Sequence, residues 1–123
     1  MATPDQIREV VARYAKRLTA GSASDIADLY TADAVVEDPV GTPPHEGRDA
    51  IEKFYATVCQ ADLTAEHQGV RVAGDSAAFG LTVVAKAGDQ TITVNPIDVM
   101  TFDSDGKITS MRAYWSQDDM TVE

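Results

Sequence analysis

Hydrophobic residues near the N-terminus recur at the spacing of a helix with one buried face. After Thr3, apolar residues lie three and four positions apart, and basic residues occupy the opposite side. Thr3, followed by Pro4 and then Gln6, is typical of a capped helix start, and Gly21 favours its end. This pattern predicts a first helix whose buried stripe consists of Ile7, Val10, Val11, Tyr14 and Leu18.

Two further helices and one strand are predicted before residue 60. A short helix is expected from Ser24, as its N-cap, through Leu29 and Tyr30. The β-branched run that ends at Asp38 and Pro39 predicts a strand over residues 34–39, followed by a turn-rich loop. A third helix is expected from about Arg48, with one apolar face formed by Ile51, Phe54, Tyr55 and Val58.

From Leu63 onward the pattern predicts strands, separated by turns at residues 73–75, 87–89 and 103–106. Four strands in antiparallel succession are the simplest arrangement. Helices followed by a meandering sheet indicate an α+β fold in which the helices cover one face of a curved sheet. The length of 123 residues is that of a single domain, which we expect to span residues 1–123.

Composition and charge narrow the functions that the chain could have. The chain has 10 Lys and Arg against 20 Asp and Glu, giving a net charge of −10, which disfavours nucleic acid and anionic membrane surfaces as partners. The one cysteine, Cys59, cannot form an intramolecular disulfide. With no basic leader pattern and no run of about 18 apolar residues, we expect a soluble, cytoplasmic protein.

Asp98 lies on the apolar side of its predicted strand, Thr91 to Phe102. A carboxylate buried there needs a cationic partner or a raised pKa, and no Lys or Arg lies on the same face. Alternatively the strand bends, and Asp98 reaches solvent or caps a turn. We favour a functional role, because the neighbours of Asp98 on this face are Ile92, Val94, Pro96, Met100 and Phe102.

Other candidate residues are ambiguous when taken singly. Asp38 precedes a proline and by itself favours an ordinary turn. Tyr14, Tyr30 and Tyr55 all fall on predicted apolar helix faces, where a tyrosine usually packs in the core, but three such hydroxyls suggest a hydrogen-bonded network. Tyr114 is expected to point elsewhere.

The sequence assigns no clear catalytic or metal-binding role to the remaining candidate residues. Met111, Ala113 and Trp115 share one strand face, which suits either core or the wall of an apolar pocket. His45 and His67 lack metal-ligand spacing, and Cys59 has no activating neighbour in the sequence. We therefore expect no metal and no cofactor.

Several motifs together resemble bacterial ketosteroid isomerases, the steroid Δ5-isomerases. These are Arg13-Tyr14, the segment Val36 to Gly41, Phe54-Tyr55, the segment Pro96 to Phe102, and Met111 to Trp115. The resemblance implies the fold of the nuclear transport factor 2 superfamily, with three helices packed on a strongly curved, mostly antiparallel sheet. Such a sheet forms a cone around an apolar pocket. The resemblance also implies a homodimer formed through the sheet and an apolar steroid as substrate.

The same resemblance implies roles for individual residues. Asp38 matches the general base that moves a proton from C4 to C6 of a 3-oxo-Δ5-steroid. Tyr14 and a protonated Asp98 match the two oxyanion-hole donors, and in ketosteroid isomerases that acid is kept neutral by its apolar site. Tyr30 and Tyr55 match supporting tyrosines. Expected substrate-binding residues are Phe54, Met111, Trp115, Val40 and Met100.

Two other functions remain open from the sequence. One is an enzyme of the same superfamily of the polyketide-cyclase type, which also uses a buried Asp for proton chemistry. The other is a non-catalytic binder of an apolar ligand, because one fold serves many functions. The complete set Tyr14, Asp38 and Asp98 favours the isomerase, since a binder needs none of these groups to ionise.

Overall fold

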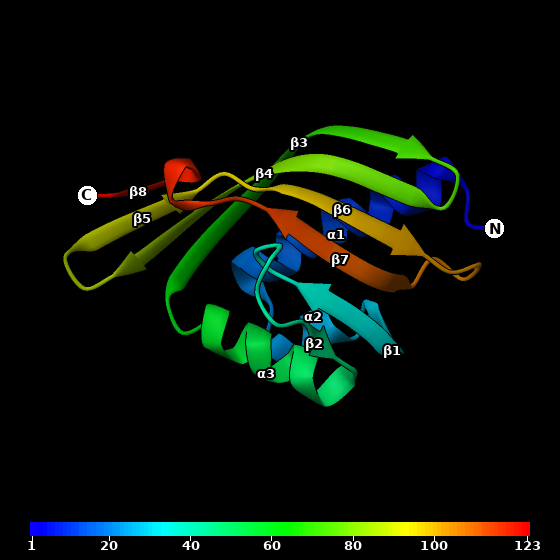
Figure 1. The fold of residues 1–123 in the computed structure, drawn as a ribbon, viewed down its shortest axis with the longest axis horizontal. Helices are drawn as coiled ribbons and strands as arrows, with labels where there is room; N and C mark the ends of the chain where they lie inside the picture. The colour runs from blue at the N-terminus through cyan, green and yellow to red at the C-terminus, as the bar shows by residue number, and fades with distance from the viewer.

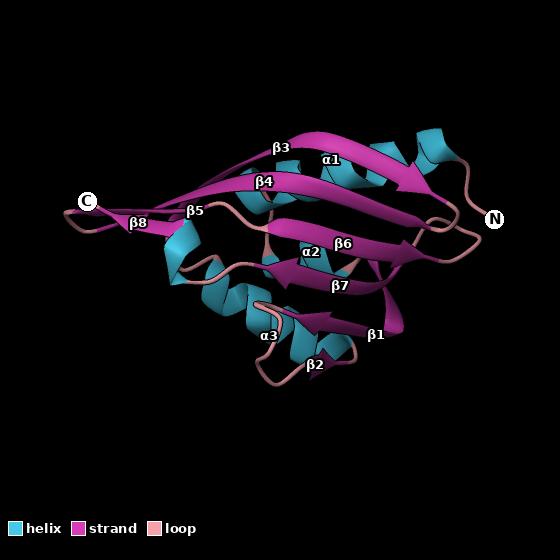
Figure 2. Ribbon diagram, turned by 45° about the horizontal axis from the view of Figure 1, so that its top comes forward, coloured by secondary structure: helices cyan, strands magenta, loops and turns pink.

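An eight-stranded sheet curves around three helices in the computed structural model, which describes residues 1–123 (Figures 1 and 2). The helices lie on the concave side of the sheet, which stays open and does not close into a barrel. The elements are α1 (Pro4–Ala20), α2 (Ala23–Ala27), β1 (Tyr30–Glu37), β2 (His45–Glu46), α3 (Arg48–Val58), β3 (Asp62–Ala73), β4 (Ser76–Ala87), β5 (Gln90–Val94), β6 (Ile97–Phe102), β7 (Ile108–Tyr114), the 3₁₀ turn η1 (Gln117–Asp119) and β8 (Met120–Val122).

The sheet is mixed, with one parallel pair among antiparallel ones. Its strand order is β2-β1-β7-β6-β4-β5-β8, and β3 pairs with β4. The parallel pair joins β1 to β7, the elements that bring Asp38 and Trp115 to the same end of the sheet. The predicted α+β class and curved, mostly antiparallel sheet are confirmed, but the prediction of only four strands after residue 62 is wrong.

Helices α1 and α3 follow the predicted pattern, whereas α2 differs from it. Thr3 and Gln6 form the expected capping box of α1. The cap of α2 is Ser22 and not Ser24, because Ser22 and Asp25 bond reciprocally to each other's backbone N–H. The helix ends before Leu29, and Tyr30 lies in strand β1.

The segment expected as a single strand over residues 91–102 is two strands, β5 and β6, which separate at Asn95-Pro96. The cause lies in β4, which pairs with β6 along Ser76–Gly80 and with β5 along Val83–Ala87. The predicted alternation still holds within β6, where Asp98, Met100 and Phe102 are buried. A short 3₁₀ turn, η1, also follows where no helix was expected.

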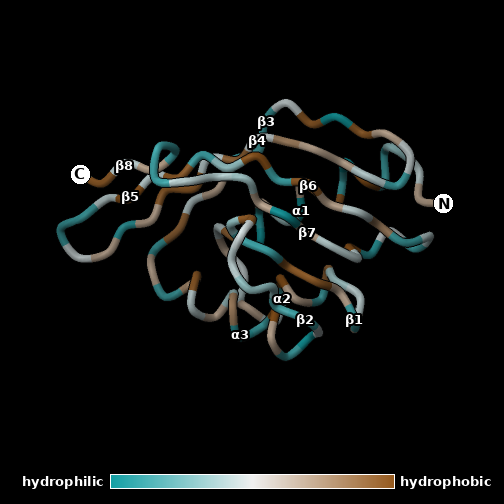
Figure 3. The backbone as a smooth tube through the Cα atoms, viewed as in Figure 1, coloured by the Kyte–Doolittle hydropathy of each residue, from teal (hydrophilic) through white to brown (hydrophobic).

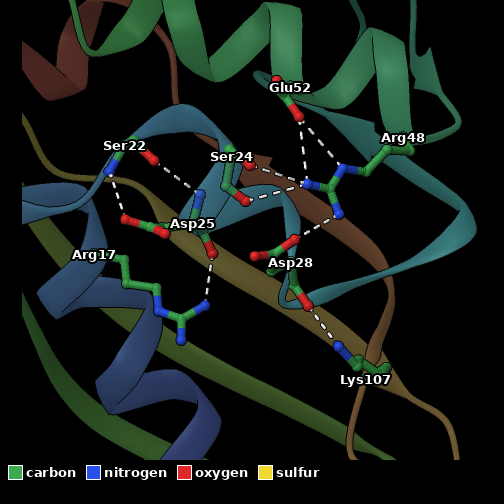
Figure 4. Close-up of polar contacts among 8 residues, drawn as sticks. All are labelled: Arg17, Ser22, Ser24, Asp25, Asp28, Arg48, Glu52 and Lys107. Atoms are coloured by element: carbon green, nitrogen blue, oxygen red, sulfur yellow. Dashed lines mark hydrogen bonds and ion pairs between the residues drawn. The ribbon is translucent and has the colours of Figure 1, made fainter.

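The short helix α2 is held in place by side chains from elsewhere in the chain (Figure 4). Arg48 of α3 donates to Ser24 and pairs with Asp28 at 2.7 Å. Arg17 of α1 donates to the carbonyl of Asp25, and Lys107 donates to the carbonyl of Asp28. These contacts join α1, α3 and the β6–β7 turn around α2.

Hydrophobic side chains from all three helices and from the sheet form one core. Asp98 is the only residue with a formally charged side chain among the buried positions. No helix is long and apolar enough to cross a membrane.

Candidate active site

A cavity of about 200 Å³ lies between the helices and the concave face of the sheet. The side chains around it are apolar or aromatic apart from two carboxyl groups, those of Asp38 and Asp98. A mostly apolar pocket with a few convergent polar groups is the usual form of a small-molecule site. The lining residues are Tyr14, Leu18, Asp38, Phe54, Tyr55, Val58, Leu81, Val83, Val94, Pro96, Asp98 and Trp115.

Asp98 is held inside the sheet. It lies on β6 opposite Phe79 of β4 and Ala113 of β7, and it is 1% exposed. Its Oδ1 atom has no hydrogen-bond partner. Burial, with a smaller contribution from the charge of Asp38, raises the pKa of Asp98 to about 8. The carboxyl group is therefore mostly protonated at pH 7, and it can donate a hydrogen bond into the cavity.

Asp38 follows strand β1 at the wall of the cavity and is half-buried. The pKa of its carboxyl group is raised overall, because desolvation outweighs the hydrogen bond from Trp115 and the charge of His45, which both lower it. The indole Nε1–H of Trp115 donates to Asp38 Oδ1 at 2.7 Å. A carboxylate that keeps one strong donor and still faces the cavity can accept a proton from a bound ligand.

Three tyrosine hydroxyls form a buried chain beside the two acids, which confirms the predicted network. The hydroxyl of Tyr55 lies 2.9 Å from that of Tyr14 and 2.6 Å from that of Tyr30. Burial raises the pKa of all three phenols well above the ordinary value. They therefore stay neutral at pH 7, and the side chains of Tyr14 and Tyr55 both line the cavity.

The fold brings most of the predicted site residues together. Tyr14, Asp38, Tyr55 and Asp98 all line the cavity, with Phe54 and Trp115 among its walls. Tyr30 lies behind Tyr55 and reaches the site through its hydrogen bond. The exposed position of Tyr114, away from the cavity, agrees with the sequence.

Three residues predicted to bind substrate do not line this cavity: Val40, Met100 and Met111. Met100 and Met111 lie opposite each other on β6 and β7, and both are fully packed in the core. Val40 follows the end of β1, where its backbone N–H donates to the carbonyl of Ala113. The cavity extends from Asp98 in the opposite direction, toward Leu81 of β4.

Sequence reasoning missed part of the wall. Leu81 and Val83 of β4 were not recognised, although they continue the alternation of Ala77 and Phe79 along the strand. The hydrogen bond between Trp115 and Asp38 joins residues 77 positions apart, and no local pattern indicates it.

The residues left without a role lie at the edge of the site or outside it. The ring of His45 stacks on Phe54 with centroids 4.5 Å apart. Cys59 is the C-cap of α3, and His67 lies on β3. No group of three or more His, Cys, Asp or Glu side chains is placed to hold a metal ion.

Comparison with known proteins places the chain in a family. The model of the SnoaL-like domain matches residues 11–111. The chain belongs to the SnoaL-like family. Among relatives of this SnoaL-like chain, the steroid Delta-isomerase of Nocardioides simplex is 49% identical over 95% of both chains. The epoxide hydrolase LasB of Streptomyces lasalocidi is 26% identical over 91% of this chain but only 42% of its own length.

Solved structures agree with this assignment. The epoxide hydrolase/cyclase-like enzyme SalBIII, which is associated with pyran ring formation in the polyether salinomycin, superposes with a TM-score of 0.93 at 29% identity. RV0760c of Mycobacterium tuberculosis superposes with a TM-score of 0.89 at 23% identity, which shows the fold alone. Both comparisons cover the whole of each chain. The fold is therefore the cone of the nuclear transport factor 2-like proteins.

Proposed function

We propose that this SnoaL-like protein is a steroid Δ-isomerase that converts 3-oxo-Δ5-steroids into their conjugated Δ4 isomers. The observation that carries the proposal is one apolar cavity holding a carboxylate, a neutral carboxyl group and a neutral tyrosine hydroxyl. The 49% identity to a protein named steroid Delta-isomerase supports it.

In the proposed reaction, Asp38 acts as the general base. Its carboxylate removes a proton from C4, and the electron pair moves toward the C3 oxygen to form a dienolate. The same carboxyl group then returns the proton to C6, and the double bond ends between C4 and C5. One proton leaves and one returns, so the step needs no redox partner.

Tyr14 and Asp98 act as the oxyanion hole. Both groups stay protonated because they are buried, so both can donate a hydrogen bond to the oxygen as its negative charge develops. An ionised Asp98 would repel that charge. Tyr55 and Tyr30 orient the hydroxyl of Tyr14 through the hydrogen-bonded chain.

Epoxide opening with ring closure is a second candidate reaction. It is favoured by the likeness to SalBIII at 29% identity and to LasB at 26%. The higher identity to the isomerase favours double-bond migration. A non-catalytic binder is the third alternative, but a binder needs none of Tyr14, Asp38 and Asp98 to be ionisable.

The decisive assay follows the enone absorbance as purified protein acts on 5-androstene-3,17-dione. We expect Asp38→Asn to lower kcat by roughly 10²–10⁴-fold or more. Tyr14→Phe and Asp98→Leu should each lower it by roughly 10²–10³-fold. Retained binding of equilenin, an analogue of the dienolate, would show that the variants are folded. Absence of turnover above buffer in the unaltered protein would refute the proposal.

The assembly and location of the protein are part of the same proposal. Ile97 and Tyr114 lie opposite each other on β6 and β7 and are 51% and 43% exposed on the outer face of the sheet. We propose that this face contacts a second copy in a homodimer. A cytoplasmic location, and the absence of nucleic-acid and membrane partners, stay predictions.

A further inference from the structure

The cavity extends along strand β4, away from Met100. Along β4, Phe79 lies opposite Asp98, and the next inward residues, Leu81 and Val83, both line the cavity. In the other direction from Asp98, Met100 is sealed in the core. Val83 lies four residues beyond the level of Asp98, or about 14 Å along the strand. The cavity therefore runs from the two acids toward the extension formed by β4, β5 and β8.

Beyond Val83 and Val94, the same face of this extension is apolar. Val83 pairs with Val94, and Ala85 pairs with Ile92, so the four side chains share one face. Strand β8 continues this face, since Val94 pairs with Met120 and Ile92 with Val122. We call the four residues beyond the cavity the apolar strip: Ala85, Ile92, Met120 and Val122.

The opposite face of the same strands is mostly polar. Thr93 pairs with Val84 and with Thr121, and Lys86 pairs with Thr91. Val84 is the one apolar residue among these five. The alternation therefore places hydrophobic side chains on the face that continues the cavity, as expected of a surface that binds an apolar group.

No helix covers the apolar strip fully. The extension projects past the end of α3 and ends in the hydrophilic β4–β5 turn (Figures 1 and 3). Ala85, Ile92 and Met120 are half-buried, and Val122 is 52% exposed. An apolar surface that is continuous with a catalytic cavity but still partly exposed can bind the part of a ligand that the cavity does not enclose.

We infer that the apolar strip binds an aliphatic side chain on the ring farthest from the ketone, so that the preferred substrates are 3-oxo-Δ5-steroids bearing a hydrocarbon tail. This inference rests on the proposed function. With the ketone between Tyr14 and Asp98, the rings lie along Leu81 and Val83 and the tail reaches Ala85, about 20 Å beyond the level of Asp98.

A second copy of the chain is the competing occupant. The outer face, with Ile97 and Tyr114, already provides an exposed apolar surface for such a contact. A chain seated on the strip instead would lie across the end of the cavity at Val83 and Val94. The continuity of strip and cavity therefore favours a ligand.

The test compares two substrates with the same rings, 5-androstene-3,17-dione and 5-cholesten-3-one, which carries a hydrocarbon tail at C17. The readout is the ratio of kcat/KM for the tailed substrate to that for the dione. Ile92→Asp and Val122→Asp should each lower this ratio on the order of tenfold, the loss expected when two methylene groups are no longer buried. The matched controls are Thr93→Asp and Thr121→Asp, on the opposite face of the same strands. They should leave kcat/KM unchanged for both substrates.

A second readout does not need turnover. Trp115 is the only tryptophan and lines the cavity, so its fluorescence reports binding of the product enones with and without the tail. If neither substrate reacts, the proposed function fails, and the ratio of the two dissociation constants still tests the strip. The inference would be overturned if Ile92→Asp and Val122→Asp left both the kcat/KM ratio and the dissociation-constant ratio unchanged. It would also be overturned if these variants changed the oligomeric state and not the ratios.

Discussion

Asp38 and Asp98 lie in the same cavity, but their surroundings favour different protonation states. Asp98 is enclosed in the sheet with no donor for Oδ1, so burial keeps it neutral. Asp38 is only half-buried; desolvation raises its pKa too, but the hydrogen bond that it accepts from Trp115 stabilises the charged form and opposes this rise. The pair can therefore supply one base and one acid from the same residue type.

The raised pKa of Asp98 predicts a cost in stability that grows with pH. Because the folded-state pKa, about 8, exceeds the unfolded value, this carboxyl group favours folding at low pH, and the benefit is lost as pH rises from about 4 to about 8. Asp98→Asn removes this titration. The melting temperature of the variant relative to the unaltered protein should therefore rise between pH 5 and pH 8. If the melting temperatures of the two proteins changed with pH in parallel across this range, the raised pKa would be contradicted.

Trp115 is predicted to limit how far burial raises the pKa of Asp38, the proposed base. Trp115→Phe keeps an aromatic ring at the cavity but removes the Nε1–H donor to Asp38, so the pKa of Asp38 should rise. The acid limb of the kcat/KM profile should then move to higher pH. Tyr114→Phe is the control, because the Tyr114 hydroxyl contacts Arg112 and not Asp38. If the pH profile of Trp115→Phe did not move, the indole of Trp115 would contribute packing but no effect on the pKa of Asp38.

At the scale of elements, α2 shows how tertiary contacts stabilise a segment that is too short to be stable alone. The helix has five residues, and an isolated helix of this length is not stable in water. Its position depends on Arg48 of α3, which contacts Ser24 on α2, Asp28 at the C-cap of α2, and Glu52 on α3. Strand β1, which carries Tyr30 and leads to Asp38, begins directly after α2 and its turn.

Arg48→Ala should therefore lower the melting temperature and also weaken turnover, because it loosens the start of β1. Arg13→Ala is the matched control. Arg13 makes one exposed pair with Glu9 on its own helix, and such pairs contribute little. The melting temperature and kcat are measured for both variants and compared with those of the unaltered protein. Equal effects of both substitutions would contradict a specific role for Arg48.

At the scale of the whole molecule, the proposed dimer must form between two chains that each carry a net charge of −10. Repulsion between them should weaken association at low salt, where screening is poor. The apolar contact at Ile97 and Tyr114 would have to outweigh it.

Ile97→Lys is expected to shift the protein to a monomer, because it places a charge on the exposed apolar face proposed as the interface. Sedimentation equilibrium at two salt concentrations measures this directly, and the unaltered protein should associate more tightly at the higher one. Gln90→Lys, at the exposed start of β5, adds the same charge outside that face. A protein that is monomeric before any substitution would rule out the dimer.

Much of the fold and of the candidate site follows from local pattern. The stripe that contains Tyr14 and the helix from Arg48 were predicted because three-and-four spacing reports a buried helix face. Asp98 was recognised because alternation placed a carboxyl group among apolar neighbours, and the structure confirms that it is buried. These features depend on residues within a few positions of one another, so they can be predicted from the sequence alone.

Features that depend on the pairing of distant segments could not be predicted from local pattern. The division of residues 91–102 into β5 and β6 follows from the two partners of β4. The contact of Trp115 with Asp38, and the course of the cavity past Leu81 and away from Met100, follow from how the strands and helices pack. The free energy of such contacts is gained only when remote segments meet, and no local spacing along the chain records which segments those are.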